Sequence, residues 1–250
     1  MDLKTWGSYY NKIMEDFGFD KEKDFESAVI LNEIIENTKN NISLDGVKNI
    51  IEGKEVYIFG AGPSLKNHVK IVKEIIKTKA KTKEMDLEDN YIIISADGAT
   101  KALLEEGLIP DIIVSDLDGD MSSIFESNDK GSIVVVHAHG DNIDKIQKYA
   151  GKLKNIVGST QVPKEFDYLI NYGGFTDGDR CCFLAEEFGA KKIILCGMDF
   201  GIYTTKYSRP NLKNDVEVAD DIKVKKLKYA EKFVNWLKEH GKCGIAYIDQ

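Results

Sequence analysis

Residues Ser95–Asp120, SADGATKALLEEGLIPDIIVSDLDGD, carry the pattern that decides the fold. Two short β-branched runs, Tyr91–Ile94 before this stretch and Ile112–Val114 within it, have few polar interruptions. Strands that are covered on both faces in a parallel sheet have this character. Each run is followed by acidic residues, and ligands of open α/β sheets bind beyond the carboxyl ends of the strands. We therefore expect these acids to converge on one crevice.

The acids are Asp97 after the first run and Asp116 and Asp118 after the second. Residues two apart on a strand share a face, so an Asp-x-Asp pair just past a strand end brings two hard oxygens to one cation. Magnesium keeps several waters and is usually held by one or two carboxylates plus substrate phosphates. The sequence thus predicts a magnesium site at Asp116 and Asp118, with Asp97 nearby. A turn or a helix N-cap explains Asp97 or Asp120 equally well when each is taken singly.

Strand patterns alternate with helical patterns throughout the chain from Glu55 onward. Strands are predicted at 56–59, 91–95, 112–115, 133–137, 155–157 and 192–195, and helices at 64–77, 99–106, 143–150, 180–188 and 221–240. Such alternation indicates βαβ units. The predicted fold class is α/β, with a mostly parallel, doubly wound sheet and helices on both faces, in a catalytic domain of residues 51–250. The charged segment 77–89 is expected to be an exposed excursion.

Residues 1–50 show a different pattern, in which two helical stretches are joined by the connection GFDKEKD. The apolar residues at helical spacing are Trp6, Tyr9, Tyr10, Ile13, Met14 and Phe17, then Phe25, Ala28, Val29, Leu31, Ile34 and Ile35. We predict a small N-terminal helical appendage. Its aromatic stripe is expected to belong to a hydrophobic core and not to a ligand platform.

The composition argues against several classes of protein. The chain has 42 acidic and 34 basic residues and a formal net charge of -8, whereas non-specific nucleic-acid binding depends on Lys and Arg neutralising phosphates. There is no run of 18 apolar residues, and the start MDLKTWGSYY lacks the apolar core of a signal peptide. We expect a cytoplasmic protein that binds small molecules, not a membrane or nucleic acid. The four cysteines are spaced as free thiols, not as zinc ligands.

A glycine-containing turn, GAGPSL at Gly60–Leu65, lies between the first predicted strand of this domain and the next predicted helix. Glycines there let the backbone approach a ligand, and Pro63 and Ser64 are typical of a helix start, where N–H groups favour anions. A phosphate or nucleotide cradle is therefore expected. The turn is not a dinucleotide fingerprint, since Leu65 replaces the third glycine, and it is not a Walker P-loop, since no Gly-Lys-Ser/Thr comes after it. A tight turn without a ligand is the alternative.

Two more loops come directly after predicted strands. HAHGDN, His137–Asn142, holds two of the four histidines, and we expect His139 and Asp141 to orient phosphate or substrate. Zinc binding is a weaker alternative because it would need a third ligand. In GMDF, Gly197–Phe200, Asp199 reaches the same edge of the sheet, and a simple turn explains it equally well.

The segment FTDGDR, Phe175–Arg180, leads into another predicted helix. Thr176 or Asp177 can cap this helix, and Arg180 in its first turn is placed to clamp a phosphate. A cation in the first turn of a helix opposes the helix macrodipole. This conflict favours a functional role for Arg180 over that of a solvated surface charge.

These motifs together resemble a known family. The segment ADGA…LIPDIIVSDLDGD is similar to the thiamin diphosphokinase pattern. The ordered set GAGPSL, SADGA, SDLDGD, HAHGDN, FTDGDR and CGMDFG, after a helical N-terminal region, more closely resembles the archaeal 6-hydroxymethyl-7,8-dihydropterin diphosphokinase family over nearly the full chain. The resemblance implies transfer of a diphosphate from ATP to the hydroxymethyl group of a reduced pterin. This reaction would release AMP on the route to tetrahydromethanopterin.

The resemblance also implies roles for individual residues. Magnesium would be held by Asp116 and Asp118, with Asp97 holding metal-bound water or the nucleotide. The expected ATP-binding residues are Gly60, Gly62, Pro63, Ser64, Asp97 and Gly98. Arg180 would stabilise the charge that develops between the β-phosphorus and the departing AMP. The candidates for reading the amino group and ring N–H of the pterin are Asp177, Asp179 and Asp199, and those for a general base are His139, Asp141 and a metal-bound hydroxide.

Other functions stay open at this point. Thiamin diphosphokinase is the nearest enzyme, although Ala99 and Gly119 stand where that family usually has glycine and serine. A nucleotide-sugar transferase is a second alternative, because related domains occur in proteins tied to flagellin glycosylation. A nucleotide sensor is a third, although it has less need of acids that repel phosphates. The sequence also leaves open a homo-oligomer and a lid at Tyr203–Pro210.

Overall fold

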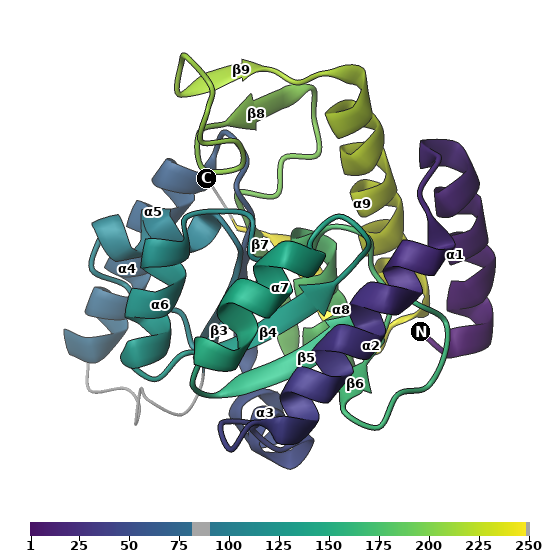
Figure 1. The fold of residues 1–250 in the computed structure, drawn as a ribbon. Helices are drawn as coiled ribbons and strands as arrows, with labels where there is room; N and C mark the ends of the chain where they lie inside the picture. Colours follow the sequence, from purple (N-terminus) through teal and green to yellow (C-terminus); the bar gives the residue numbers. More distant parts are fainter. Residues whose placement is uncertain (82–90, 249–250) are drawn as a thin grey trace.

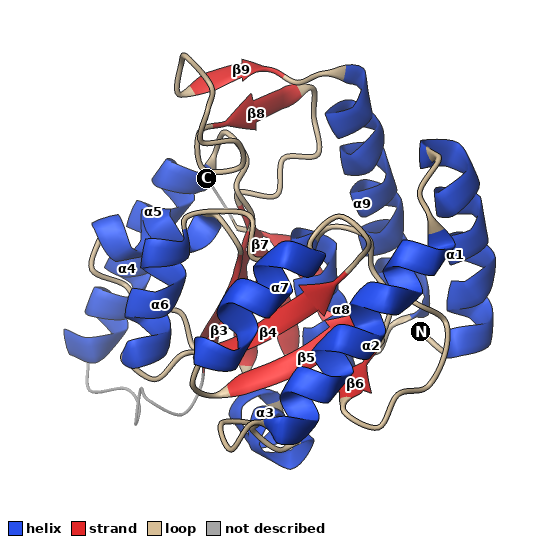
Figure 2. Ribbon diagram, in the orientation of Figure 1, coloured by secondary structure: helices blue, strands red, loops and turns tan. Residues whose placement is uncertain are grey.

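The main sheet is parallel throughout. The computed structural model describes residues 1–81 and 91–248, and in this part of the chain eight strands form one sheet in the order β10-β7-β1-β2-β3-β4-β5-β6. Figure 2 shows strands of this sheet, in red, with helices, in blue, around them. Its strands are β1 (Glu55–Phe59), β2 (Tyr91–Ala96), β3 (Ile112–Ser115), β4 (Ile133–Ala138), β5 (Ile156–Thr160), β6 (Leu169–Ile170), β7 (Lys192–Cys196) and β10 (Gly244–Tyr247). All neighbouring pairs are parallel, and the chain winds in both directions from β1. The predicted α/β class is confirmed.

Helices cover both faces of this sheet (Figure 1). They are α1 (Leu3–Phe17), α2 (Lys21–Asn37), α3 (Leu44–Ile51), α4 (Leu65–Lys81), α5 (Ala99–Glu105), α6 (Met121–Asp129), α7 (Ile143–Tyr149), α8 (Asp177–Glu187) and α9 (Asp221–His240), with a 3-10 turn at Ala150–Lys152. Successive strand residues point to opposite faces. Val56 and Ile58 of β1 therefore pack with α1, α3, α8 and α9, whereas Tyr57 and Phe59 pack with α4 and α5. Helices α2, α6 and α7 cover the same second face over β3, β4 and β5.

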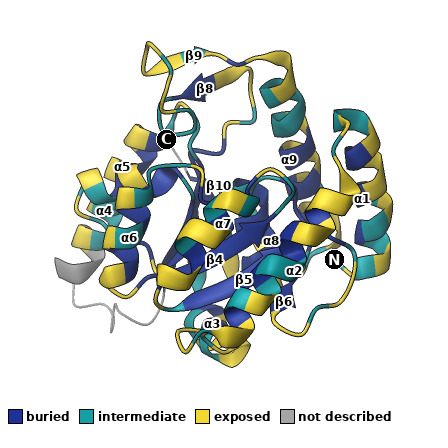
Figure 3. Ribbon diagram, in the orientation of Figure 1, coloured by how far each residue is buried: buried dark blue, intermediate teal, exposed yellow. Residues whose placement is uncertain are grey.

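The burial of the strands explains why the sequence pattern was informative. Every residue of β3 and β4 is buried, and Figure 3 shows the sheet as a dark layer between exposed helix faces. Such strands need apolar residues at consecutive positions and not at alternate ones. The predicted strands agree with the structure to within three residues at each end, and α9 begins and ends as predicted.

Several elements were missed by the sequence analysis. Helix α6 has a polar sequence, MSSIFESND, strand β6 has only two residues, and β10 is a partly exposed edge strand. The segment Tyr203–Pro210 begins with strand β8 (Tyr203–Thr205), which pairs antiparallel with β9 (Val216–Val218). Residues 77–81 of the predicted exposed excursion form the end of α4, and residues 82–89 lie outside the described residues.

The N-terminal region is helical, as predicted, but it does not pack as an appendage. Trp6, Tyr10 and Ile13 of α1 are buried in the same core as β1 and α8, and Leu31 of α2 packs against the other face of the sheet. The aromatic stripe is therefore core, as expected. The boundary at residue 50 marks a change of sequence pattern, whereas the helices before it share the core of the sheet.

Two further observations concern composition. None of the helices in the described part of the chain is long and apolar enough to cross a membrane. The four cysteines are free thiols, of which Cys181, Cys182 and Cys196 are buried.

Candidate functional site

A cavity of about 520 Å³ lies at the carboxyl edge of the central strands. The loops after β1, β2, β3, β4 and β7 line it, together with the start of α8, the connection between α1 and α2, and the start of α9. Most residues predicted from the sequence lie here, namely Gly60, Gly62, Pro63, Asp97, Gly98, Asp116, Asp118, His139, Asp141, Asp177, Arg180 and Asp199. Ser64 and Asp179 do not line the cavity.

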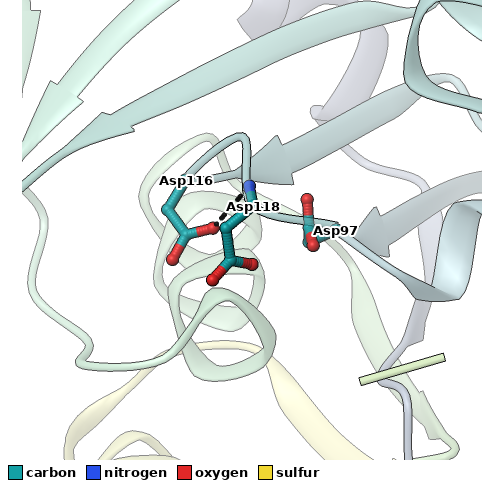
Figure 4. Close-up of side chains that lie close together, drawn as sticks. All are labelled: Asp97, Asp116 and Asp118. Carbon is teal, nitrogen blue, oxygen red and sulfur yellow. Dashed lines mark hydrogen bonds between the residues drawn. The ribbon is translucent and has the colours of Figure 1, made fainter. Parts of the chain in front are cut away.

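The three aspartates predicted to surround a metal ion converge at this edge (Figure 4). One carboxylate oxygen from each of Asp97, Asp116 and Asp118 lies within 4.8 Å of the others. Leu117, between the last two, is buried and has a left-handed backbone with a φ of 64°. This conformation costs a non-glycine residue about 1 kcal/mol. The backbone N–H of Asp118 donates to Oδ1 of Asp116 at 3.2 Å, which holds the turn.

The turn SDLDGD is shaped around the Asp97 carboxylate. The Ser115 hydroxyl donates to Oδ1 of Asp97, and the backbone N–H of Leu117 donates to Oγ of Ser115 at 2.8 Å. A Cβ atom at Gly119 would lie 2.1 Å from Oδ2 of Asp97, so this close approach requires glycine. Asp120 instead caps α6, which is the alternative that the sequence left open for that residue, and it lies outside the cavity lining.

Burial and mutual repulsion set the ionisation of this carboxylate cluster. Burial, followed by the charge of Asp116, raises the pKa of Asp97 to about 8. The same two causes raise the pKa of Asp118. Burial acts in this direction on Asp116 also, but hydrogen bonding, first of all from His139, outweighs it and lowers the pKa of Asp116 to about 2. Three carboxylate oxygens at this spacing suit a hard divalent cation, which prefers oxygen ligands and would relieve the repulsion.

His139 contacts this cluster from the loop after β4. Its Nε2 lies 3.3 Å from Oδ2 of Asp116, and its Nδ1 lies 3.3 Å from the backbone N–H of Asp141, which can only donate. Nδ1 is therefore the acceptor and Nε2 carries the proton that is donated to Asp116. The Asn142 side chain, missed by the sequence analysis, donates to the carbonyl oxygens of Asp116 and His137 at 2.8 and 2.7 Å. The Asn142 side chain thus joins the loop after β4 to the loop after β3.

The glycine turn packs tightly against the loop after β7. A Cβ atom at Gly60 would lie 2.5 Å from Sδ of Met198, and one at Gly62 would lie 2.2 Å from Oδ2 of Asp199. That same Asp199 oxygen accepts the backbone N–H of Ser64 at 3.0 Å. The glycines thus serve the packing of two loops as well as leaving backbone exposed to the cavity.

Gly98 also has a packing role. A Cβ atom there would lie 1.7 Å from the carbonyl oxygen of Tyr207. Glycine therefore allows the segment after β8 to reach the rim of the cavity beside Asp97.

The two acids at the start of α8 have different roles, because Asp179 caps the helix and Asp177 lines the cavity. Asp179 accepts the backbone N–H groups of Phe175 and Thr176 at 2.6 and 2.7 Å in a capping box, and it is fully buried. Its oxygens therefore point away from the cavity toward the backbone. Asp177 lines the cavity, and its pKa is raised well above the usual value by burial and by the charge of Asp116.

Arg180 is held by a buried chain of hydrogen bonds that starts in the N-terminal helices. Its Nη2 donates to Oε1 of Gln161 at 3.1 Å and to the carbonyl oxygen of Phe175 at 3.0 Å. The Gln161 amide in turn donates through Nε2 to Oδ2 of Asp24 at 2.6 Å. Because Gln161 has one donor end and one acceptor end, Asp24 decides which end faces Arg180. The sequence analysis missed both Asp24 and Gln161.

Asp24 has two further donors. The Tyr10 hydroxyl lies 3.1 Å from its Oδ2, and the backbone N–H of Gly140 lies 2.7 Å from its Oδ1. A single buried carboxylate thus connects α1, α2, the His139 loop and Gln161. Nothing in the local pattern around Asp24 marks it, because most of its partners are distant in the sequence.

Two lysines of α9 line the cavity and were also missed. They are Lys223 and Lys226, in the first two turns of the helix. The pattern that pointed to Arg180 could also have pointed to Lys223. Both are cations in the first turn of a helix, where the macrodipole disfavours a positive charge.

The parallel sheet, the cavity at its carboxyl edge and the three converging carboxylates define an α/β protein with a site suited to a divalent cation. A family model described as 6-hydroxymethylpterin diphosphokinase MptE-like matches residues 32–205. The chain belongs to this family. It is therefore an enzyme, and its class is that of the diphosphotransferases.

Three curated relatives match almost the whole chain, and each is named 6-hydroxymethyl-7,8-dihydropterin pyrophosphokinase. The protein of Methanocaldococcus jannaschii is 63% identical, over 96% of this chain and 97% of its own length. The protein of Methanothermobacter thermautotrophicus is 43% identical, over 98% and 99%. The protein of Pyrococcus furiosus is 40% identical, over 98% of both chains.

Proposed function

We propose that this enzyme transfers the diphosphate group of ATP to the hydroxymethyl group of 6-hydroxymethyl-7,8-dihydropterin, with release of AMP, in the biosynthesis of tetrahydromethanopterin. The names of the relatives support the acceptor. The observation that carries the proposal is the cluster of Asp97, Asp116 and Asp118 in a cavity that the glycine turn also lines. Phosphoryl-type transfer requires mainly alignment and charge neutralisation, which such a site can supply.

Magnesium is the proposed metal ion, with Asp116 and Asp118 as its ligands and Asp97 beside them. Their spacing and their oxygen donors suit this ion, which leaves other coordination positions for water and phosphate. When bound, it would neutralise phosphate charge and draw electrons from the phosphorus that is attacked. His139 would keep Asp116 ionised and oriented.

The proposed reaction is a single substitution at the β-phosphorus of ATP. The hydroxymethyl oxygen attacks the β-phosphorus and loses its proton. The bond from the β-phosphorus to the oxygen that bridges it to the α-phosphorus breaks, and AMP leaves with that oxygen. The backbone of Gly60, Gly62 and Pro63, after β1, and of Gly98, after the adjacent strand β2, would contact the phosphates. Arg180 would stabilise the negative charge that develops on the oxygen leaving with AMP. Ser64 would act indirectly, because its N–H is bonded to Asp199.

Two carboxylates stay candidates for binding the amino group and ring N–H of the pterin. Asp177 and Asp199 both line the cavity, whereas the oxygens of Asp179 are used by the helix cap. For the hydroxymethyl proton, His139 already donates through Nε2 and accepts at Nδ1, which favours Asp141 as the acceptor.

AMP release from ATP and magnesium tests the proposal. The reaction is run with 6-hydroxymethyl-7,8-dihydropterin, with thiamin and without an acceptor, and products are identified by mass spectrometry. Pterin-dependent AMP together with a pterin diphosphate supports the proposal. Thiamin-dependent AMP would instead make the chain a thiamin diphosphokinase, and no AMP with any acceptor would favour sugar transfer or nucleotide sensing.

A further inference from the structure

Lys223 and Lys226 form a basic wall of the cavity, and the acidic cluster contributes to the same cavity. Lys223 is close enough to Asp118 and Asp177 for their charges to act on its ionisation, without being paired with either. The cavity is therefore lined by carboxylates from the strand ends and by two lysines from the start of α9. This is the charge distribution expected around a ligand that is itself anionic and that binds with a cation.

The two ammonium groups form no ion pair with any residue that the structure describes. Among the described residues, no carboxylate lies within ion-pairing distance of Lys223 or Lys226. Burial, followed by the positive charges of Lys226 and Arg209, lowers the pKa of Lys223. The first-turn position adds an unfavourable macrodipole. Three effects thus oppose the charge on Lys223, and the described part of the chain places no counter-charge in contact with it.

The positions of both lysines are nevertheless fixed by the fold. The N-cap residue Asp220 accepts the backbone N–H of Lys223 at 2.7 Å and also pairs with the Arg209 guanidinium. The Lys226 ammonium lies over the rings of Phe19 and Phe175, at 5.6 and 6.0 Å from their centroids. Such cation–π contacts hold a charge in place without neutralising it. The backbone of Lys223 and the ammonium group of Lys226 are thus held in place, and both side chains remain available to a ligand.

We infer that Lys223 and Lys226 bind the diphosphate group that the enzyme transfers. The inference rests on the proposed function, because it assigns the ligand as a nucleotide polyphosphate. A diphosphate stays strongly anionic before and after transfer, and the three aspartates repel it wherever a metal ion does not intervene. The two ammonium groups would neutralise part of this charge throughout the reaction. Lys is suited to phosphate as a point charge.

Binding measurements test the inference directly. Isothermal titration calorimetry at constant free magnesium compares ATP, inorganic diphosphate and adenosine as ligands of the wild type and of Lys223→Gln, Lys226→Gln and Lys223→Arg. Lys228→Gln is the matched control, since Lys228 lies on the same helix and outside the cavity lining. Circular dichroism and the melting temperature establish that each variant is folded.

The expected result depends on the ligand. Lys223→Gln should weaken binding of ATP and of inorganic diphosphate by about 10- to 100-fold, the size of one lost charged hydrogen bond. Adenosine binding should not change, Lys223→Arg should retain most of the affinity, and Lys228→Gln should match the wild type. Lys226→Gln should give a smaller loss of the same kind.

Two results would overturn the inference. One is wild-type affinity for inorganic diphosphate in both glutamine variants. The other is an equal loss for adenosine, which would mean general distortion of the cavity. Failure of the proposed function gives a different result: no pterin-dependent AMP from the wild type, while diphosphate binding still depends on Lys223.

Discussion

The acidic edge and the helical wall of the cavity differ in how they are built. The acidic edge is Asp97, Asp116 and Asp118, which lie just beyond two adjacent strands within one short stretch of sequence. The helical wall consists of the basic wall, Lys223 and Lys226 of α9, together with Asp24 of α2. These helices come from opposite ends of the chain. The edge is specified by the residues at each strand end, whereas the wall exists only because distant helices pack on the sheet. We expect the acids of the edge to be indispensable for activity. The residues of the wall should only adjust the rate or the binding of the nucleotide.

The largest effect is expected at the acidic edge. Asp116→Asn should lower pterin-dependent AMP formation by about 1000-fold or more, because it removes the charge of a proposed metal ligand and turns an NH2 group toward one of its two donors, His139 or the Asp118 N–H. The rate of AMP formation at saturating substrates measures this. Asp120→Asn is the matched control, since Asp120 caps α6 outside the cavity and asparagine is also a good N-cap. Near-normal turnover of Asp116→Asn would remove that residue from the metal site.

A smaller effect is expected from the buried carboxylate of the wall. In Asp24→Asn the amide oxygen should keep the backbone N–H of Gly140, so the NH2 group faces Gln161 and Tyr10. The Gln161 amide should then turn and present its own NH2 to Arg180. The displaced guanidinium should lower kcat by about 10- to 100-fold. KM for ATP should change less, because Asp24 is not proposed to touch the nucleotide. Steady-state kinetics separate the two parameters.

A second substitution should reverse this loss. In the double variant Asp24→Asn with Gln161→Glu, the carboxylate moves from position 24 to position 161, where it accepts from both Arg180 and the new amide. The buried charge is conserved, and kcat should recover most of its value. If the double variant is no better than Asp24→Asn alone, Arg180 is not positioned through Gln161.

The acidic edge also predicts that magnesium stabilises the fold, which can be measured without an activity assay. Magnesium at about ten times its dissociation constant should raise the melting temperature by about 3 to 6 °C, because it binds the folded state alone. The repulsion from Asp116, which after burial is the second cause of the raised pKa of Asp97, is relieved at the same time. Differential scanning fluorimetry with and without EDTA measures the shift. An equal shift in Asp116→Asn would place the ion elsewhere.

The smallest effect is expected at the outer end of the wall. Tyr10→Phe removes one of the three donors to Asp24 and leaves those of Gln161 and Gly140 in place. It should cost about 1 kcal/mol and lower the melting temperature by about 2 to 4 °C. The kcat value should stay within about two-fold of the wild type, because two charged hydrogen bonds still hold the carboxylate. A ten-fold loss of kcat would show that Tyr10 itself orients the site.

The sequence analysis succeeded where a residue's place is set by its own strand. Asp97, Asp116 and Asp118 could be located because strands β2 and β3 are buried on both faces and read as unbroken apolar runs. It could not separate Asp177 from Asp179, which differ by two positions in one helix start. In the structure Asp179 is the third helical residue and accepts the backbone N–H groups, whereas Asp177 faces the cavity.

The sequence by itself determined the α/β class, the parallel sheet and the strand ends that carry the carboxylates, because backbone periodicity and burial act over a few residues. Only the tertiary structure decided that the N-terminal helices belong to the core, that Asp24 orients Gln161 toward Arg180, and that Lys223 and Lys226 enter the cavity. The contact between Asp24 and Gln161 joins residues 137 positions apart. Such geometry depends on how whole helices pack on the sheet, which no local pattern records.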